Sequence, residues 1–252
     1  MDVDHYEDGV PSWAELTTPE PAASAAFYGR LFGWHYTDGL SGKGSDRTAV
    51  LRARPVAAFT ENAGAERATW TTYVNVADAD ETAARVTAAG GGVLKAPADV
   101  SAAGRSALLS DHSGARFAVW QPGRHRGAGV VNEPGTFSWG ELITDDVEAS
   151  ADFYGLVFGW TATAPEGTLG RREWRLNDRP VSGLLPRPPA MPAEIPPYWD
   201  VYFTVADAAA TADTVTRLGG TVLMGVTPVA HGVIAVFTDP AGAVFTVLAS
   251  GR

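Results

Sequence analysis

Two glutamates in one recurring motif are the first candidates for acid–base chemistry. Glu15 and Glu141 both lie in the motif Trp-x-Glu-Leu, at residues 13–16 and 139–142. A carboxyl group in apolar surroundings has a raised pKa and can act as a general acid or base. The structural alternative is that each glutamate accepts hydrogen bonds from backbone or tyrosine groups and fixes its strand. The sequence leaves both roles open.

Two more titratable side chains lie in the second half of the chain. Asp200 belongs to an alternating, strand-like segment, and His231 lies in an Ala-His-Gly turn before a terminal strand. Asp200 offers a second carboxyl group, and histidine is the side chain that ordinarily changes its charge near neutral pH. Their structural alternatives are a strand-end carboxylate and a solvated turn histidine. The predicted catalytic set is therefore Glu141, Asp200, Glu15 and His231.

Aromatic side chains in the same segments predict a surface for a planar ligand. Because residues two apart share one face of a strand, the apolar set of segment 70–76 should face a helix and the other residues the ligand. Trp and Tyr rings on that ligand face can stack on a planar molecule, although packing in the core is the alternative. The predicted ligand-binding residues are Trp13, Trp139, Tyr73, Tyr202, Asn75 and Thr246.

The sequence segments that must position these residues occur twice in the chain. Ser12–Thr18 returns 126 residues later as Ser138–Thr144, and the sequence Phe-Tyr-Gly-x-x-Phe-Gly-Trp occurs at 27–34 and 153–160. A repeat of this length indicates duplication of a whole domain. We predict a first domain at 8–121, a Gly- and Pro-rich linker at 122–135 and a second domain at 136–250.

Within each copy the pattern predicts strand, helix and strands, taken twice. For the first helix, Thr18 before Pro19 predicts an N-cap, and Gly33 predicts the stop. In the second copy, Asp145 and Glu148 have the spacing of a capping box, and Gly159 is the stop. Residues 186–197 hold six prolines and should form a loop or an extended arm.

Composition excludes several classes of function. The chain has no cysteine, which excludes disulfides, thiolate metal sites and cysteine nucleophiles. A net charge of −10 without a basic face argues against nucleic acid. No apolar run is long enough to span a bilayer, and the acidic N-terminus does not look like a signal peptide. We expect a cytoplasmic monomer or homodimer that contacts neither nucleic acid nor membrane.

Two features of the sequence resemble the vicinal oxygen chelate superfamily. One is the helix motif, and the other is the turn Asp-x-x-Gly before a closing Phe-containing strand, at 111–117 and 239–245. This superfamily includes glyoxalase I, bleomycin- and fosfomycin-resistance proteins and extradiol dioxygenases, and the Trp-x-Glu-Leu motif resembles a two-domain actinobacterial subgroup labelled glyoxalase-like or hydroxylase. The resemblance implies an α+β fold, a tandem repeat of two glyoxalase-like domains. Each domain would consist of paired βαβββ modules that form a curved, cup-shaped sheet with the ligand in its concave face. Whether the modules pair within one copy or across the two copies stays open.

The same resemblance places the metal ligands of the superfamily at positions that carry few ligands here. These positions hold Trp13, Thr71 and Ala118 in the first copy and Trp139, Asp200 and Thr246 in the second. One carboxylate does not make a high-affinity site for a divalent ion, so we expect neither a bound metal nor another cofactor.

The sequence therefore predicts a protein that binds a small apolar or aromatic organic molecule. The first hypothesis is a metal-independent enzyme of natural-product or detoxification metabolism, an isomerase, cyclase, lyase or hydroxylase-like protein, in which Glu141 moves a proton with Asp200 or His231. The alternative is a non-catalytic protein that sequesters an antibiotic or another small molecule. The second cup is expected to dominate, because it adds Asp200 and is bordered by the proline-rich arm.

Overall fold

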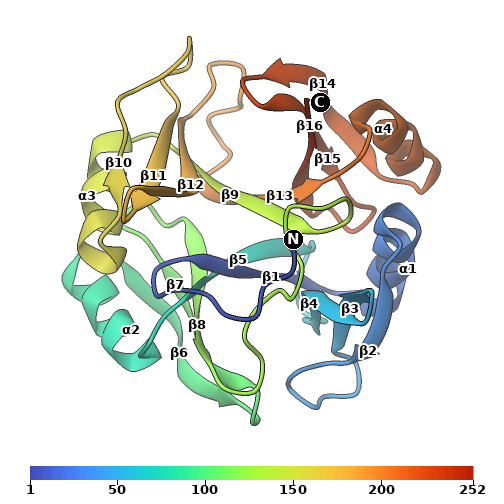
Figure 1. The fold of residues 1–252 in the computed structure, drawn as a ribbon, viewed down its shortest axis with the longest axis horizontal. Coiled ribbons are helices and arrows are strands. Elements are labelled where there is room, and N and C mark those ends of the chain that lie inside the picture. The colour runs from blue at the N-terminus through green and yellow to red at the C-terminus, as the bar shows by residue number, and fades with distance from the viewer. Residues whose placement is uncertain (252) are drawn as a thin grey trace.

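Each copy of the repeat forms its own eight-stranded sheet in the computed structural model, which describes residues 1–251. The strand order is β2-β3-β4-β1-β5-β8-β7-β6 in sheet 1 and β10-β11-β12-β9-β13-β16-β15-β14 in sheet 2. Figure 1 shows the two sheets one above the other, with helices at both sides. The strands of sheet 1 are β1 (Pro11–Thr18), β2 (His35–Asp38), β3 (Arg47–Leu51), β4 (Arg54–Glu61), β5 (Thr69–Asn75), β6 (Gly92–Val100), β7 (Gly104–Ser110) and β8 (Arg116–Pro122). Those of sheet 2 are β9 (Phe137–Thr144), β10 (Thr161–Ala162), β11 (Arg172–Leu176), β12 (Arg179–Pro186), β13 (Tyr198–Thr204), β14 (Thr221–Val229), β15 (Gly232–Thr238) and β16 (Val244–Ser250).

Two βαβββ modules meet along one antiparallel strand pair in each sheet. In sheet 1, β1 runs parallel to β4 and antiparallel to β5, and β5 runs parallel to β8. In sheet 2, β9 and β13 make the same central pair, with β12 and β16 as their parallel neighbours. The modules therefore pair within each copy, which decides the question that the sequence left open and confirms the α+β fold of two glyoxalase-like domains.

Four helices connect the strands and follow the predicted pattern closely. They are α1 (Pro21–Phe32), α2 (Ala79–Ala88), α3 (Val147–Phe158) and α4 (Ala208–Arg217). Gly33 and Gly159 follow α1 and α3 with φ of +74°, the left-handed conformation that glycine adopts without a steric penalty. The predicted helix stops are thus confirmed.

Both predicted helix starts were wrong by one or two residues. The N-cap of α1 is Glu20, whose side chain makes no capping hydrogen bond, and Pro21 is the proline of the first turn. The N-cap of α3 is Asp146, which accepts a hydrogen bond from the backbone N–H of Ala149 at 3.0 Å. Asp145 instead pairs with Arg187. Asp145 and Asp146 are adjacent residues of the same type, so the local sequence does not separate them. Thr18 lies two residues before the N-cap of α1, where its hydroxyl accepts a bond from the backbone N–H of Glu20 at 3.2 Å.

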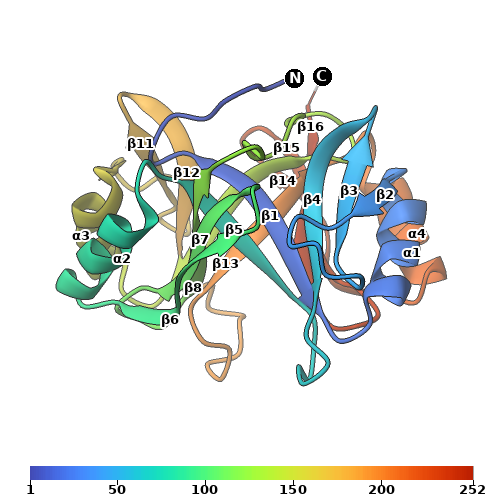
Figure 2. The same cartoon turned by 90° about the horizontal axis from the view of Figure 1, so that it is seen from below.

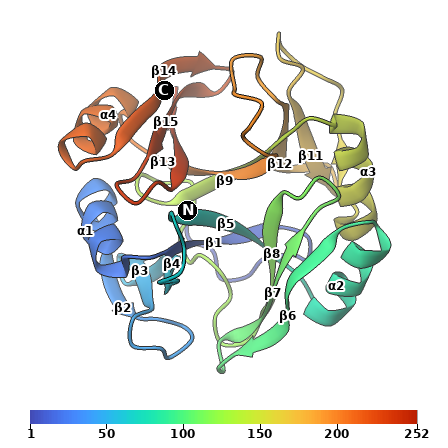
Figure 3. The same cartoon turned by 180° about the vertical axis from the view of Figure 1, so that it is seen from behind.

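The hydrophobic cores are shared between the copies. One core joins α1, β1 and β4 of the first copy to β13, β15, β16 and α4 of the second, and the other joins α2, β7 and β8 to α3, β11 and β12. Figures 1 and 3 show the consequence: α1 lies beside α4 at one side of the molecule, and α2 beside α3 at the other. Each copy therefore completes its sheet alone but buries its helices against the other copy.

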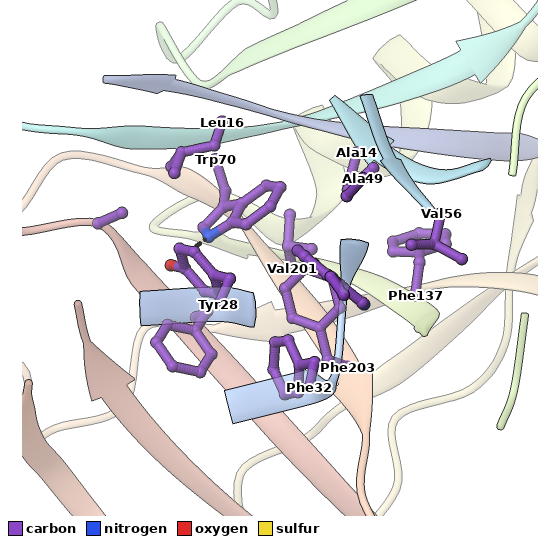
Figure 4. Packing of buried hydrophobic residues seen from close by; sticks show 14 of the residues in the cluster. Ala14, Leu16, Tyr28, Phe32, Ala49, Val56, Trp70, Phe137, Val201 and Phe203 are labelled. Atoms are coloured by element: carbon purple, nitrogen blue, oxygen red, sulfur yellow. Dashed lines mark hydrogen bonds between the residues drawn. The ribbon is translucent and has the colours of Figure 1, made fainter. Parts of the chain in front are cut away.

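Two equivalent hydrogen-bond chains cross between the copies inside these cores. Tyr28 on α1 accepts a bond from Trp70 Nε1 at 2.8 Å and donates to Asp239 Oδ2 at 3.1 Å. Tyr154 on α3 repeats this arrangement with Trp199 and Asp111, at 2.7 and 3.2 Å. Figure 4 shows Tyr28 and Trp70 packed with Phe32 and with Phe203 of the second copy. Burial raises the pKa of the two tyrosine hydroxyls well above the ordinary value, so they stay protonated donors.

The segment between the copies is packed rather than free. Ala128, Val130 and Val131 are buried, and the carbonyl of Gly135 accepts a hydrogen bond from Trp34 Nε1 at 2.6 Å. Trp160 makes the equivalent bond to the carbonyl of Gly9 at 2.7 Å. The predicted linker therefore holds the first copy in place instead of acting as a flexible tether.

The proline-rich stretch is the loop from β12 to β13, as expected. In Figure 2 this loop and the β4–β5 connection project from the same side of the molecule. Among residues 1–251, no helix is both long and apolar enough to span a membrane.

Replacing Tyr28 or Tyr154 by phenylalanine should destabilise the whole chain. Each change leaves a buried indole N–H and a buried carboxylate oxygen without a partner, which costs about 1–3 kcal/mol of unfolding free energy. Tyr36→Phe is the matched control, because the Tyr36 hydroxyl is buried without a hydrogen-bond partner and its removal should cost little. Urea unfolding measures all three; a loss at Tyr36 as large as at Tyr28 would contradict the role assigned to these chains.

Candidate functional site

The concave faces of the two sheets form two cups, which we call cup 1 in sheet 1 and cup 2 in sheet 2. In cup 1, Glu15 lies opposite Ala58 and Thr71 on the neighbouring strands. In cup 2, Glu141 lies opposite Gly183 and Asp200. The register therefore brings Glu141 and Asp200 together, as the sequence predicted, and gives cup 1 no second carboxyl group at that position.

Glu141 is held by two partners at the floor of cup 2. Its side chain is 3% exposed, and Oε1 accepts a bond from Arg171 Nε at 2.5 Å. Oε2 accepts a bond from the hydroxyl of Tyr202 at 2.6 Å. Because both carboxylate oxygens are committed, Glu141 is better placed to hold a fixed charge than to exchange a proton with a ligand.

Gly183 makes room for this arrangement. A Cβ at this position would lie 2.4 Å from Glu141 Oε1 and 2.8 Å from Trp139 Nε1. The equivalent residue in cup 1 is Ala58, which pairs with Glu15 in the same register. At this position the two cups thus differ by a single methyl group.

Asp200 is the carboxyl group with an uncommitted oxygen. It is 4% exposed; Oδ2 accepts a bond from Thr246 Oγ1 at 2.5 Å, whereas Oδ1 is buried without a hydrogen-bond partner. Burial raises the pKa of Asp200 to about 7, with a further contribution from the charge of Glu141. A buried polar atom without a partner is rare in folded proteins, so Oδ1 marks a position where a ligand or a water molecule can bind.

Aromatic rings form the walls of cup 2. Trp139 is half-buried and its Nε1 has no hydrogen-bond partner, while Tyr202 is 9% exposed. Trp139 lies opposite Tyr202 on the neighbouring strand. The indole N–H of Trp139 and Oδ1 of Asp200 are therefore two buried polar groups of cup 2 that have no partner among residues 1–251.

Two predicted site residues, His231 and Asn75, belong to neither cup. His231 is exposed in the β14–β15 hairpin, at the edge of sheet 2. Asn75 is buried, and its Nδ2 donates to the carbonyl of Tyr6 at 3.0 Å, which fixes the N-terminal segment. An open pocket of about 390 Å³ lies at the start of α4, outside both cups.

Cup 1 differs from cup 2 in charge. Glu15 is half-buried and accepts a bond from Thr60 Oγ1 at 3.1 Å. Burial raises the pKa of Glu15, and the negative charge of Asp46 raises it further. Hydrogen bonds from the hydroxyl groups of Thr60 and Tyr73 act in the opposite direction and lower it. Asp46 directly precedes β3, and Arg171 directly precedes β11, so the two residues occupy equivalent positions. Cup 1 therefore has an acidic residue at the position where cup 2 has the arginine that pairs with Glu141. Trp13, 1% exposed, packs edge-on against His125 with ring centroids 4.3 Å apart.

Arg171, Asp46 and Gly183 are the site residues that the sequence reasoning missed. A signal existed in the sequence, because Arg-Pro-Val occurs at 54–56 and again at 179–181, directly after turns in which residues 52–53 and 177–178 all have positive φ. Aligning these turns would have placed Asp46 and Arg171 at one position. The contact of Arg171 with Glu141, however, joins side chains 30 residues apart and depends on the fold.

The metal-ligand positions of the superfamily do not fit a divalent ion here. Trp13, Thr71 and Ala118 provide no strong ligand, and in cup 2 only Asp200 is a carboxylate, already bonded to Thr246. Glu141 is neutralised by Arg171. Among residues 1–251, no three histidine, aspartate or glutamate side chains form a group that can hold a metal.

Comparison with known proteins agrees with this architecture. The family model of the Glyoxalase/Bleomycin resistance protein/Dioxygenase superfamily matches residues 3–119 and 131–247. The chain is 38% identical to a protein named putative glyoxylase CFP32 from Mycobacterium tuberculosis, over 96% of this chain and 95% of that protein. It is 37% identical to the anthracycline biosynthesis protein DauV from Streptomyces sp., over 96% and 94%.

Solved structures share the fold at much lower sequence identity. A 2,3-dioxygenase, LapB from Pseudomonas, superposes with a TM-score of 0.68 at 13% identity, covering 98% of this chain and 94% of the dioxygenase. An Mn(II)-bound glyoxalase from Novosphingobium aromaticivorans gives 0.67 at 17% identity, over 95% and 81%. With two copies of the family's paired modules and full-length relatives above one-third identity, this chain belongs to the glyoxalase/bleomycin resistance/dioxygenase superfamily.

Proposed function

We propose that the chain binds a planar, oxygen-bearing aromatic molecule in cup 2 and that Asp200 exchanges a proton with it. The observation that carries this proposal is the buried Oδ1 of Asp200, which has no partner, on a carboxyl group whose pKa is about 7. A group with this pKa is present in both protonation states near neutrality, as a general acid–base catalyst requires. The free N–H of Trp139 provides a second point of contact for a ligand oxygen.

Glu141 and Arg171 take positioning roles in this proposal. Their ion pair fixes one negative charge opposite Asp200, and this charge contributes to the raised pKa of Asp200. Tyr202 fixes the other oxygen of Glu141 and presents its ring to the cup. The sequence favoured Glu141 as the proton carrier; the geometry favours Asp200, supported by Glu141.

The relatives support the choice of ligand class. A protein of anthracycline biosynthesis shares 37% of its residues with this chain over almost the full length of both, and cup 2 presents aromatic walls of the kind that bind planar rings. The metal positions of the cup lack the ligands for a divalent ion, so the chemistry we propose is proton transfer by side chains, as in an isomerisation or a cyclisation.

Sequestration without chemistry is the second candidate. It is favoured by the commitment of both Glu141 oxygens, which leaves Asp200 as the only cup 2 carboxyl with a buried oxygen that has no partner among residues 1–251. The two candidates differ in the fate of the ligand. A ligand that co-purifies and is recovered chemically unchanged after incubation supports sequestration, whereas a product identified by mass spectrometry supports an enzyme.

The protonation of Asp200 should appear in the pH dependence of stability. A folded-state pKa of about 7 against an ordinary value of 3.8 means that the folded chain binds this proton more tightly than the unfolded chain. Asp200 therefore favours folding at acidic pH, and this contribution is lost as pH rises from about 4 to about 7.

Asp200→Asn removes this titration, so the variant should gain stability relative to the parent between pH 5 and pH 8.5, by about 1 kcal/mol or more. Chemical unfolding of both proteins across this range measures the difference. Asp213→Asn, which removes an exposed carboxyl group from α4, is the control and should give a constant difference. A constant difference at Asp200 as well would contradict the raised pKa.

Ligand binding tests the site itself. With 1,4-dihydroxyanthraquinone as the probe, Asp200→Asn and Glu141→Gln should each weaken binding at least tenfold, about 1.4 kcal/mol, because one removes the free carboxyl group and the other breaks the ion pair. Glu15→Gln in cup 1 should weaken it less, and Asp213→Asn should leave it unchanged. Fluorescence titration gives the dissociation constants; equal losses at Glu15 and Glu141 would reject cup 2 as the site.

A further inference from the structure

Cup 1 contains a small cavity that the function proposed for cup 2 does not use. The cavity has a volume of about 40 Å³ and is lined by Trp13, Tyr73, Trp120 and Glu15, among others. A single water molecule needs about 10–15 Å³ on this scale. The cavity therefore accommodates the head group of a ligand rather than a ring system.

The walls of the cavity form an aromatic cage around a carboxyl group. Tyr73 and Trp120 meet at 6.4 Å between ring centroids in an edge-to-face arrangement, and Trp13 is held against His125 behind it. Trp120 is fixed further by a hydrogen bond from Nε1 to the carbonyl of His125 at 3.0 Å. Rings held in this way around a small space are the environment in which proteins bind ammonium groups through cation–π interactions.

No cationic side chain of the described residues forms a hydrogen bond or an ion pair with Glu15, whose carboxylate accepts a bond from Thr60. Asp46 stands at the position of Arg171 and is itself buried, bonded to the backbone N–H of Glu61 at 3.3 Å. Arg47 lines the cavity, but its guanidinium donates to the backbone carbonyls of Gly44 and Asp46. Lys95 acts on Glu15 only through its charge, from an exposed position on β6. Among residues 1–251, Glu15 forms no salt bridge, whereas the equivalent Glu141 does.

We infer that cup 1 is a second binding site, specific for the ammonium group of a small amine. In this site the ammonium group lies beside Glu15, as the guanidinium of Arg171 lies beside Glu141 in cup 2. The carboxylate of Glu15 pairs with the cation, and the rings of Trp13, Tyr73 and Trp120 cover it. Asp46 adds negative charge next to the site. The two cups thus bind different chemical classes: an oxygen-bearing aromatic in cup 2 and a cation in cup 1.

The test compares two probes of nearly equal shape, protonated benzylamine and neutral benzyl alcohol. We expect benzylamine to bind at least ten times more tightly at pH 7.5 and to shift the indole ¹H–¹⁵N resonances of Trp13 and Trp120. Glu15→Gln should reduce the affinity for benzylamine to that for benzyl alcohol. Asp38→Asn, which removes an exposed charge at the end of β2, should leave it unchanged and so controls for the net charge of the chain.

Equal affinity for the two probes, or shifts confined to Trp139, would overturn the proposal. So would a folded Glu15→Gln variant that binds benzylamine as tightly as the parent. If Glu15→Gln does not fold, Asp46→Asn provides the second variant: it removes one of the two negative charges and should weaken benzylamine binding severalfold, and an unchanged affinity would also overturn the inference. Because the two titrations use different probes and depend on different variants, Asp200→Asn for cup 2 and Glu15→Gln for cup 1, either site can fail without the other.

Discussion

The structure depends on the exchange of hydrophobic cores between the two copies. Each copy completes an eight-stranded sheet by itself, but the aromatic stripe of α1 packs on strands of the second copy, and that of α3 packs on strands of the first. Tyr28 and Tyr154 fix this exchange, because each bonds a tryptophan of its own copy and an aspartate turn of the other. A buried donor or acceptor that loses its partner is costly, so the register between the copies is held at two equivalent points.

This exchange leaves the concave faces free to differ. The convex side of each sheet and all four helices are committed to the shared cores, where a change in size is felt by both copies. The floors of the cups differ at equivalent positions, with Ala58 against Gly183, Thr71 against Asp200 and Asp46 against Arg171. One scaffold therefore presents two pockets of different charge.

The electrostatic difference between the cups arises at two equivalent positions, where cup 2 has Arg171 and Asp200 and cup 1 has Asp46 and Thr71. In cup 2, Glu141 pairs with Arg171, and the charge of Glu141 helps to raise the pKa of Asp200. In cup 1, Asp46 raises the pKa of Glu15 instead, and the nearby arginine is bound to backbone carbonyls. Burial contributes most in both cases, because removing a carboxylate from water disfavours its charged form.

The sequence by itself determined the duplication, the element types, the helix stops at Gly33 and Gly159, and the strand faces that carry Glu15, Glu141 and Asp200, because these depend on local periodicity and backbone sterics. It did not determine which of the adjacent Asp145 and Asp146 caps α3, since the two residues are of the same type. Only the tertiary structure decided that modules pair within a copy while cores are shared between copies. It also decided that Arg171 reaches Glu141 and that Asp200 keeps a free oxygen, because strand register and the packing space left by Gly183 bring together residues that no local pattern connects.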